Sequence, residues 1–235
     1  MTAFTKTQID RLGDKLRSQV VSEQELKLLD DYRRTFSSAY DRVADKIRTA
    51  IGTPVSGRPA KSTTSIVEKL KRESIRLSQM QDIAGCRAIV ADIGAQERAV
   101  ESIRRDFPAA TVLDRRRHPS HGYRAVHVVV REDDKPIEIQ LRTPLQHVWA
   151  EMCEKFADII DPAIKYGGGP PRVQASLSKL ATVIEAMEAL EGVVAGAGTA
   201  YNDTAEDLRR LRLKFAAALT TLVAEIPALD PEELT

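Results

Sequence analysis

Residues 122–142 read GYRAVHVVVREDDKPIEIQLR, and this stretch decides the fold. Apolar and polar residues alternate on both sides of Asp133–Asp134, which predicts two antiparallel strands over Gly122–Arg131 and Lys135–Arg142. Helical spacing precedes the hairpin at Ser62–Arg72 and follows it at Thr143–Ile160. Strands interspersed with helices indicate an α+β protein, in which a mixed or antiparallel sheet of about five strands is flanked by helices.

The two ends of the chain are predicted to be helical. Ser22 and Glu25 have the spacing of a capping box and begin a predicted long helix over residues 22–50, with a shorter one over 5–19 ahead of it. The sequence GGGPP at 167–171 is typical of a linker, and two apolar stripes at helical spacing follow it. Three regions are therefore predicted: an N-terminal helical region (1–52), a sheet domain (53–166) and a C-terminal helical extension (167–235).

Composition excludes several classes of protein. The 235 residues are 43% hydrophobic and 29% charged, as in ordinary globular proteins and unlike collagens or disordered chains. Lys and Arg number 35 against 34 Asp and Glu, so any electrostatic recognition must be local. Cys86 and Cys153 are expected to be reduced core thiols. No stretch approaches the roughly 18 apolar residues of a membrane helix, so we expect a cytoplasmic protein with no membrane partner.

The hairpin is predicted to carry one polar face. Alternate residues of a strand share a face, which groups Glu138, Gln140 and Arg142 on one strand and Tyr123 and His127 on the other. An ordinary solvated face has the same alternation. A tyrosine and a histidine facing an acid, an amide and a guanidinium are more typical of a recognition surface.

A second cluster follows one side of the predicted helix after residue 61. Lys61, Ser65, Lys69 and Arg72 are spaced four, four and three residues apart, and Ser62 or Thr63 can cap the helix. Cations gathered near free backbone amides favour the binding of a polyphosphate. An amphipathic surface helix with ordinary lysines would show the same spacing.

Two further features complete the inventory. Asp82 precedes a predicted buried strand over Gly85–Asp92, where it is either a metal ligand or a turn residue. Arg115–Arg117 form a basic loop that suits phosphate, although such runs are often only solvated. Two carboxylates for Mg²⁺, a cationic helix, an aromatic ring and a basic loop together indicate phosphoryl or pyrophosphoryl transfer.

The order of these pieces resembles a known family. The matching blocks are GRPAKSTTSIVEKLKRE (57–73), QMQDIAGCRAIV (79–90), HGYRAVHVVV (121–130) and IEIQLRTPLQHVWAEM (137–152). They closely resemble the synthetase domain of RelA/SpoT-type alarmone synthetases over about residues 57–155, which implies a nucleotidyltransferase-like synthetase fold. The length, and the absence of hydrolase, TGS and ACT regions, resemble the small single-domain members, including the toxic ones.

The resemblance implies a function for each predicted residue. The family uses Mg²⁺ and transfers the β,γ-pyrophosphate of ATP to the ribose 3′-hydroxyl of GDP or GTP, which makes (p)ppGpp in the stringent response. By matching position, Asp82 and Glu138 would bind Mg²⁺ and Glu138 would activate the hydroxyl. The ATP-binding residues would be Arg58, Lys61, Ser65, Lys69, Arg72 and Arg87. The acceptor-binding residues would be Tyr123, His127, Gln140, Arg142, Arg115 and Arg117.

Two departures from the family pattern leave alternatives open. Pro59 stands where an arginine is expected, and the stretch before Gly-Tyr-Arg is shortened to DRRRHPSHGYR. Toxic members of this type modify the 3′-CCA end of tRNA or make adenosine analogues, and are neutralised by an antitoxin. An inactive nucleotide-binding regulatory module is the remaining alternative. The C-terminal helices are expected to pack on the core, form a homo-oligomer or bind a partner.

Overall fold

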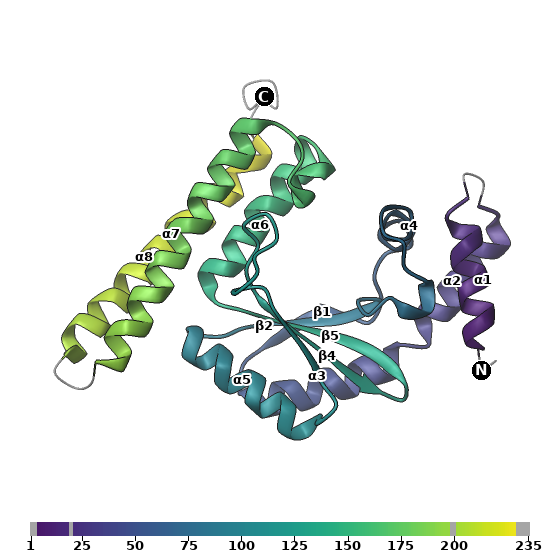
Figure 1. The fold of residues 1–235 in the computed structure, drawn as a ribbon, viewed down its shortest axis with the longest axis horizontal. Helices are drawn as coiled ribbons and strands as arrows, with labels where there is room; N and C mark the ends of the chain where they lie inside the picture. The colour runs from purple at the N-terminus through teal and green to yellow at the C-terminus, as the bar shows by residue number, and fades with distance from the viewer. Residues whose placement is uncertain (1–3, 19–20, 198–200, 229–235) are drawn as a thin grey trace. The chain divides into compact units, whose positions relative to one another are not determined.

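The computed structural model describes residues 4–18, 21–197 and 201–228 (Figure 1). The helices are α1 (Lys6–Leu16), α2 (Glu23–Arg34), α3 (Ser37–Ile51), α4 (Thr63–Arg72), α5 (Ile93–Asp106), α6 (Pro144–Ile159), α7 (Pro171–Gly196) and α8 (Asn202–Glu225). Short 3₁₀ helices are η1 (Leu77–Gln79), η2 (Pro162–Tyr166) and η4 (Ile226–Ala228). The strands are β1 (Val55–Arg58), β2 (Ala84–Ile89), β3 (Thr111–Asp114), β4 (Val126–Glu132) and β5 (Lys135–Arg142).

The five strands form one mixed sheet in the order β1-β2-β5-β4-β3. β1 is antiparallel to β2, with Val55 opposite Ala88 and Arg58 opposite Gly85. β2 and β5 run in the same direction, because Gly85 lies against Glu138 and the amide of Val90 donates to the carbonyl of Arg142. The predicted α+β class, with about five strands flanked by helices, is confirmed.

The chain divides into two compact units, each of which combines separate stretches of the sequence. Unit 1 comprises Met1–Ala88, Glu101–Val112 and His127–Gln140. In it α1 packs against α2, α4 and η1, and α3 packs against β1. Its core consists mainly of buried aliphatic side chains of these helices and of β2, β4 and β5, among them Leu16, Leu29, Ile47, Ile66, Leu77, Val128, Ile137 and Ile139.

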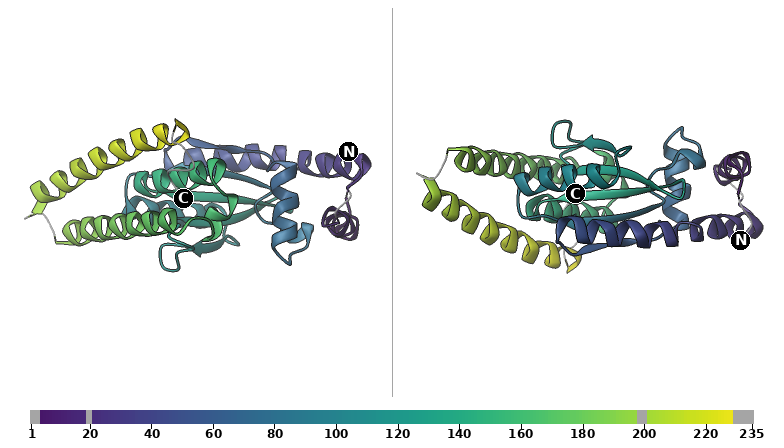
Figure 2. Two further views of the ribbon diagram at one scale, coloured as in Figure 1. Left: turned by 90° about the horizontal axis from the view of Figure 1, so that it is seen from above. Right: turned by 90° about the horizontal axis from the view of Figure 1, so that it is seen from below.

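Unit 2 comprises Ile89–Val100, Leu113–Val126 and Leu141–Thr235. Within it α6 packs against both α7 and α8, and Figure 2 shows α7 and α8 as two long helices alongside each other. The indole of Trp149 on α6 is buried and donates to the carbonyl of Leu177 on α7. The predicted apolar stripes are buried only in part. Leu177 and Ile184 of α7 and Leu219 of α8 are buried, whereas Leu190, Leu211 and Leu222 are about half exposed. None of the helices in the described ranges has the length and apolar character of a membrane-spanning segment.

The prediction of one long helix over 22–50 is wrong in one respect, because the structure has two helices there, α2 and α3. The Thr35 hydroxyl donates to the carbonyl of Tyr32 at 2.6 Å, and the amide of Thr35 donates to the same oxygen. In a continuous helix that oxygen would accept from the amide of Phe36, which instead bonds Arg33. The capping box of Ser22 and Glu25 is confirmed, and α3 ends at Ile51 with Gly52 as its C-cap. The shorter predicted helix is α1, which ends at Leu16; residue 19 lies outside the described residues.

The strand predicted to begin at Gly122 begins at Val126 instead. His121 and Gly122 have φ values of 52° and 86°, and Ser120 and Tyr123 form an isolated bridge around them. Left-handed backbone at two successive residues makes a tight turn, which interrupts the extended chain. A Cβ on Gly122 would lie 2.9 Å from the ring of Trp149, so close packing as well as conformation requires glycine. Tyr123 is therefore outside the strand that carries His127, contrary to the predicted shared face.

Candidate functional site

Helix α4 begins at a serine cap that orients its cationic side. The Ser62 hydroxyl accepts from the amide of Ser65 at 3.2 Å and also hydrogen bonds the Ser65 hydroxyl at 2.8 Å. Ile66 and Leu70 are buried on the opposite side, because residues four apart share a helix face. This anchoring leaves Lys61, just before the cap, and Lys69 on the polar side, as the sequence predicts.

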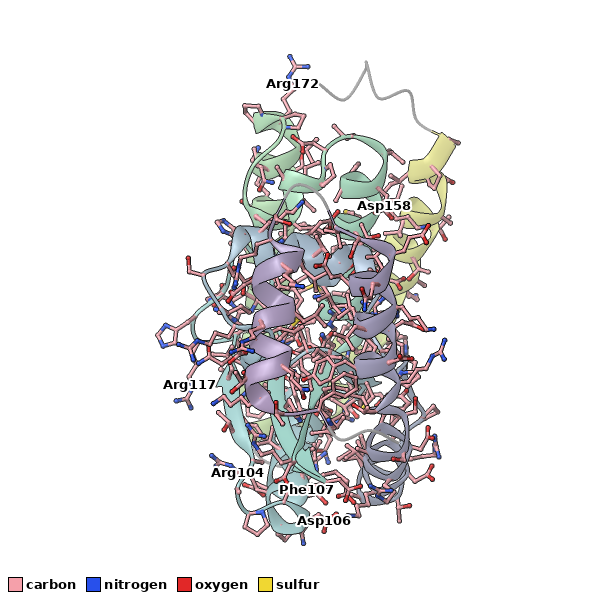
Figure 3. All side chains as sticks on the ribbon, turned by 90° about the vertical axis from the view of Figure 1, so that its right-hand side faces the viewer. Arg104, Asp106, Phe107, Arg117, Asp158 and Arg172 are labelled. Atoms are coloured by element: carbon pink, nitrogen blue, oxygen red, sulfur yellow. The ribbon has the colours of Figure 1, made fainter. Side chains whose placement is uncertain are left out.

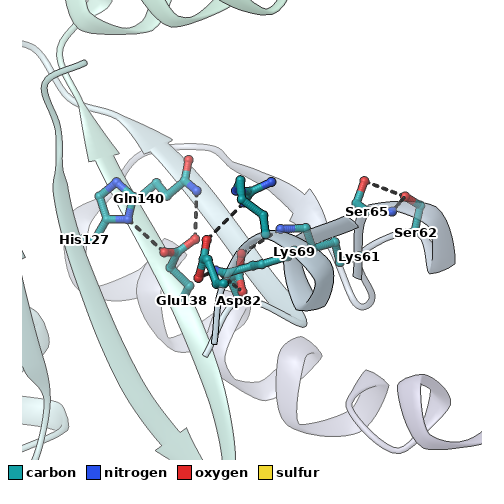
Figure 4. Close-up of polar contacts among 10 residues, drawn as sticks. Lys61, Ser62, Ser65, Lys69, Asp82, His127, Glu138 and Gln140 are labelled. Atoms are coloured by element: carbon teal, nitrogen blue, oxygen red, sulfur yellow. Dashed lines mark hydrogen bonds and ion pairs between the residues drawn. The ribbon is translucent and has the colours of Figure 1, made fainter. Parts of the chain in front are cut away.

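Both lysines bind one carboxylate. Lys61 Nζ lies 2.8 Å from Asp82 Oδ2, and Lys69 Nζ lies 2.9 Å from Asp82 Oδ1 (Figure 4). The side chains of all three residues are about one-fifth exposed. Burial alone would raise the pKa of Asp82, but the two ammonium groups outweigh it and hold the pKa below its ordinary value. Asp82 is therefore ionised at neutral pH.

A second carboxylate is held on the hairpin. Glu138 on β5 accepts from Gln140 Nε2 at 2.8 Å, and His127 Nδ1 on β4 lies 2.8 Å from its other oxygen. Burial would raise the pKa of Glu138, yet the hydrogen bonds from His127 and Gln140 more than compensate and lower it. An ionised carboxylate only accepts, so His127 donates from Nδ1.

Asp82 and Glu138 lie beside each other (Figure 4). The charge of Asp82 acts on Glu138 strongly enough to oppose the lowering of its pKa. Gly85 permits this approach, because a Cβ there would lie 2.9 Å from the carbonyl oxygen of Glu138. The structure thus brings together two acids that are far apart in the sequence, with lysines around one and a histidine and an amide around the other.

This pair suits a hard divalent cation. Mg²⁺ in phosphate-transfer sites takes one or two carboxylates and completes its shell with water and substrate oxygens. Two neighbouring ionised carboxylates repel each other, and a cation between them would relieve that repulsion. Within the described ranges no group of three or more His, Cys, Asp and Glu is placed to hold a metal. Binding of Mg²⁺ by Asp82 and Glu138 stays a prediction.

The remaining ATP-side candidates also belong to unit 1. Arg58 is exposed at the end of β1, and Arg87 is half-buried on β2, opposite Ser56. Arg72 is exposed and pairs with Glu73 at 3.0 Å. Their roles in binding ATP stay predictions.

Tyr123 and Arg142 lie together in unit 2. The guanidinium carbon of Arg142 is 5.2 Å from the centre of the Tyr123 ring, and Arg142 Nη2 donates to the tyrosine hydroxyl at 3.1 Å. Arg142 is buried, and the ring of Trp149 lies 6.3 Å from that of Tyr123. A guanidinium against one side of an aromatic ring rigidifies it, which suits the ring as a stacking platform.

The basic loop is not uniformly available to a ligand. Arg116 makes two hydrogen bonds to Asp114, at 2.9 and 2.8 Å, which raise the pKa of its guanidinium. Arg117 is largely exposed and projects from the surface (Figure 3). The backbone amide of Arg115 donates to the carbonyl of Ala125. The outer arginine therefore suits a polyanion better than Arg116 does.

Sequence reasoning missed a buried polar cluster in unit 2. It consists of Gln96 on α5, Thr143 and Gln146 at the start of α6, and Glu188 on α7, all at most 5% exposed. The spacing Thr-x-x-Gln ahead of an apolar helix is the signature of a capping box, and the box is present. Glu188 interrupts the apolar stripe of α7 one helical turn after Ile184, which was the available signal for a buried acid.

The central part of the chain resembles known proteins. Residues 57–157 match the family model described as "Region found in RelA / SpoT proteins". The match covers less than half of the chain, and this part is similar to the region found in RelA/SpoT proteins. An uncharacterized protein of Mycobacterium tuberculosis (Rv1366) is 39% identical over 142 residues, covering 58% of this chain and 51% of the relative. The chain thus spans about half the length of the curated relatives of this kind.

The chain is also similar to a plant enzyme and to solved structures. A probable GTP diphosphokinase of Arabidopsis thaliana (RSH2, chloroplastic) is 33% identical over 96 residues, 39% of this chain and 13% of the relative. The structure of small alarmone synthetase 1 from Bacillus subtilis bound to its product pppGpp matches with a TM-score of 0.55 at 24% identity, covering 75% of this chain and 98% of that one. A second structure of that synthetase matches with a TM-score of 0.53 at 25% identity and the same coverage. The fold is therefore that of the small alarmone synthetases.

Proposed function

We propose that this chain is an ATP-dependent pyrophosphokinase that transfers the β,γ-pyrophosphate of ATP to the ribose 3′-hydroxyl of GDP or GTP. The observation that carries the proposal is the juxtaposition of Asp82 and Glu138, with Lys61 and Lys69 on one carboxylate and His127 and Gln140 on the other. The RelA/SpoT region and the name of the Arabidopsis relative, a probable GTP diphosphokinase, support it.

The lysines would hold the donor. Both are hydrogen bonded to Asp82, so they lie close to the acidic pair. A triphosphate offers them stronger partners, because its oxygens carry more negative charge than one carboxylate. Ser65 and the first amides of α4 lie on the same side and would add hydrogen bonds to the phosphates.

Glu138 would act on the acceptor. The 3′-oxygen attacks the β-phosphorus of ATP, the bond from that phosphorus to the oxygen bridging it to the α-phosphate breaks, AMP leaves, and the hydroxyl proton passes to Glu138. Because its pKa is lowered, Glu138 is ionised and free to accept that proton at neutral pH. His127 and Gln140 fix the carboxylate in one orientation, which places its oxygens before the acceptor binds.

Mg²⁺ would be bound by Asp82 and Glu138 and would neutralise the charge of the triphosphate during transfer. Asp82 would then share its charge between the cation and Lys61 and Lys69, and the two lysines would be close enough to contact the phosphates of the donor.

The test is to incubate the protein with Mg²⁺ and ATP labelled at the β- or γ-phosphate, together with GDP, GTP, ATP or uncharged tRNA. We expect both labels to move to GDP or GTP with release of AMP. Label on tRNA or on a second ATP would instead support a toxin-like pyrophosphokinase. No transfer to any acceptor would refute the enzymatic function and leave a nucleotide-binding module.

Variants of the hairpin make the assignment specific. Glu138→Gln should lower kcat at least about 100-fold, the usual size of a general-base contribution. Glu132→Gln is the matched control, because Glu132 lies on the same hairpin but pairs with Arg42 and Lys46 instead. Unchanged product formation by Glu138→Gln would show that Glu138 is not the base.

A further inference from the structure

The buried polar cluster of unit 2 is a closed hydrogen-bond network around Glu188. The Thr143 hydroxyl donates to Glu188 Oε1 at 2.6 Å, and Gln146 Nε2 lies 3.1 Å from each Glu188 oxygen. Gln146 Oε1 in turn accepts from the amide of Thr143 at 3.2 Å and from Gln96 Nε2 at 3.0 Å. Because Glu188 when ionised only accepts and the Thr143 amide only donates, the orientation of the Gln146 amide is determined.

Burying an acid at position 188 of α7 destabilises the fold. Leu177, Ala181 and Ile184 on the same face of α7 are buried and apolar, and burial raises the pKa of Glu188. Hydrogen bonds from Thr143 and Gln146 and the charge of Arg124 compensate only in part. A leucine would satisfy the apolar stripe at less cost. What the acid adds is orientation, because it fixes groups at the N-terminus of α6 that an apolar side chain could not hold.

Those groups adjoin the predicted acceptor platform. Thr143 directly follows Arg142, whose guanidinium lies against Tyr123. The backbone at this junction is fixed from both sides, since the Arg142 carbonyl accepts from the amide of Val90 at 2.9 Å and the Thr143 amide donates to Gln146.

The network also extends to the basic loop. Gln96 Nε2 donates to the carbonyl of Leu141, and Gln96 Oε1 accepts from Arg116 Nη1 at 3.4 Å. A single cluster in unit 2 therefore connects α7 to the β5–α6 junction and to Arg116, which lies between the predicted acceptor residues Arg115 and Arg117.

We propose that Glu188 is a positioning residue for the acceptor: through Thr143 and Gln146 it holds the β5–α6 junction so that Arg142 and Tyr123 present a fixed platform to the acceptor nucleotide. This inference rests on the proposed function. It assigns the C-terminal helix α7 a part in acceptor binding, in addition to its packing against α6.

The test compares Glu188→Gln with Glu191→Gln. Glu191 lies one turn along the same helix and pairs with Arg212 at 2.7 Å. Its replacement by glutamine makes the same chemical change outside the hydrogen-bond network. In Glu188→Gln the new amide turns a donor toward the Gln146 amide or toward the Thr143 hydroxyl, so one hydrogen bond of the network is lost. We expect the KM for GDP to rise about tenfold, the equivalent of about 1.4 kcal/mol. The KM for ATP should stay within about twofold, and Glu191→Gln should change neither.

A second readout does not depend on turnover. Trp149 is the only tryptophan of the chain, is 4% exposed, and lies on α6 beside Tyr123. Loosening of the α6 start should make its fluorescence more accessible to acrylamide quenching in Glu188→Gln and leave it unchanged in Glu191→Gln. If Glu188→Gln does not fold, Thr143→Val, which removes the hydroxyl from the other side of the same contact, serves in both assays.

The outcomes separate the two proposals. A wild-type protein that transfers label, paired with a Glu188→Gln variant whose GDP KM and quenching equal those of wild type, overturns the role of Glu188 alone. Equal rises in the KM for GDP and for ATP, or equal effects of both variants, also overturn it, because they indicate general loosening of α7. A wild-type protein that transfers label to no acceptor refutes the proposed function itself.

Discussion

Replacing Asp82 by Asn should destabilise the protein far more than a surface charge change would. Asp82 accepts two charge-assisted hydrogen bonds, from Lys61 at 2.8 Å and Lys69 at 2.9 Å, in a setting only about one-fifth exposed. Each such bond contributes about 1.5–3 kcal/mol. Asparagine keeps one acceptor oxygen and turns an amide donor toward the other ammonium. The expected loss in the free energy of unfolding is about 3 kcal/mol at pH 7, within the range for breaking a buried ion pair.

The pH dependence of that loss follows from the pKa of Asp82, which lies below its ordinary 3.8 in the folded protein. A lowered carboxyl pKa stabilises the fold fully above the unfolded value, and this contribution disappears as the pH falls through the folded value. The difference between wild type and Asp82→Asn should therefore be full at pH 7 and shrink once the pH falls below 3.8.

Urea unfolding followed by far-ultraviolet circular dichroism, at pH 7 and at acidic pH, measures both effects. Asp30→Asn is the matched control, because Asp30 likewise pairs with two cationic side chains, both arginines, at 2.8 and 2.6 Å. Its side chain, however, is 38% exposed. Its loss should stay below about 1 kcal/mol. Equal losses for the two variants, or a loss at Asp82 that does not change with pH, would refute the argument that this buried ion pair stabilises the fold.

Three further outcomes are expected. Gly85→Ala should lower the free energy of unfolding in urea by about 1–3 kcal/mol and reduce pyrophosphate transfer, because its Cβ would press on the backbone of Glu138. A variant with unchanged stability would show that β2 and β5 can move apart without loss. Gly192→Ala, with open space around the added Cβ inside α7, should instead be neutral or stabilise by up to about 1 kcal/mol, and a loss in the same assay would contradict the helix there. Burial raises the pKa of Cys86 to about 12, so its thiol should resist iodoacetamide at pH 8 until urea unfolds the chain. Mass spectrometry measures the labelling, and rapid labelling of the native protein would contradict that burial.

Local chemistry made much of the secondary structure predictable. Ser22, Ser62 and Thr143 each cap a helix. The hydroxyl of each accepts a hydrogen bond from the backbone amide three residues later. The alternation through β5 correctly places Ile137, Ile139 and Leu141 in the core, but it did not predict that Arg142 on the polar face is buried too. The errors were also local. At Thr35 a side-chain hydroxyl takes the carbonyl that the helix needs, and apolar spacing does not register such competition.

The sequence by itself determined which residue types were available: two acids, a cationic helix, a tyrosine, a histidine and arginines, in an order that resembles the RelA/SpoT synthetases. Their partners were decided by the tertiary structure. Periodicity tells which side of an element is apolar, whereas the pairing of Asp82 with both lysines depends on how α4 packs against the start of β2. Likewise, Glu188 appeared in the sequence only as a break in an apolar stripe. Its partners lie more than 40 residues away along the chain, and only packing of α7 on α6 brings their polar atoms within hydrogen-bond distance.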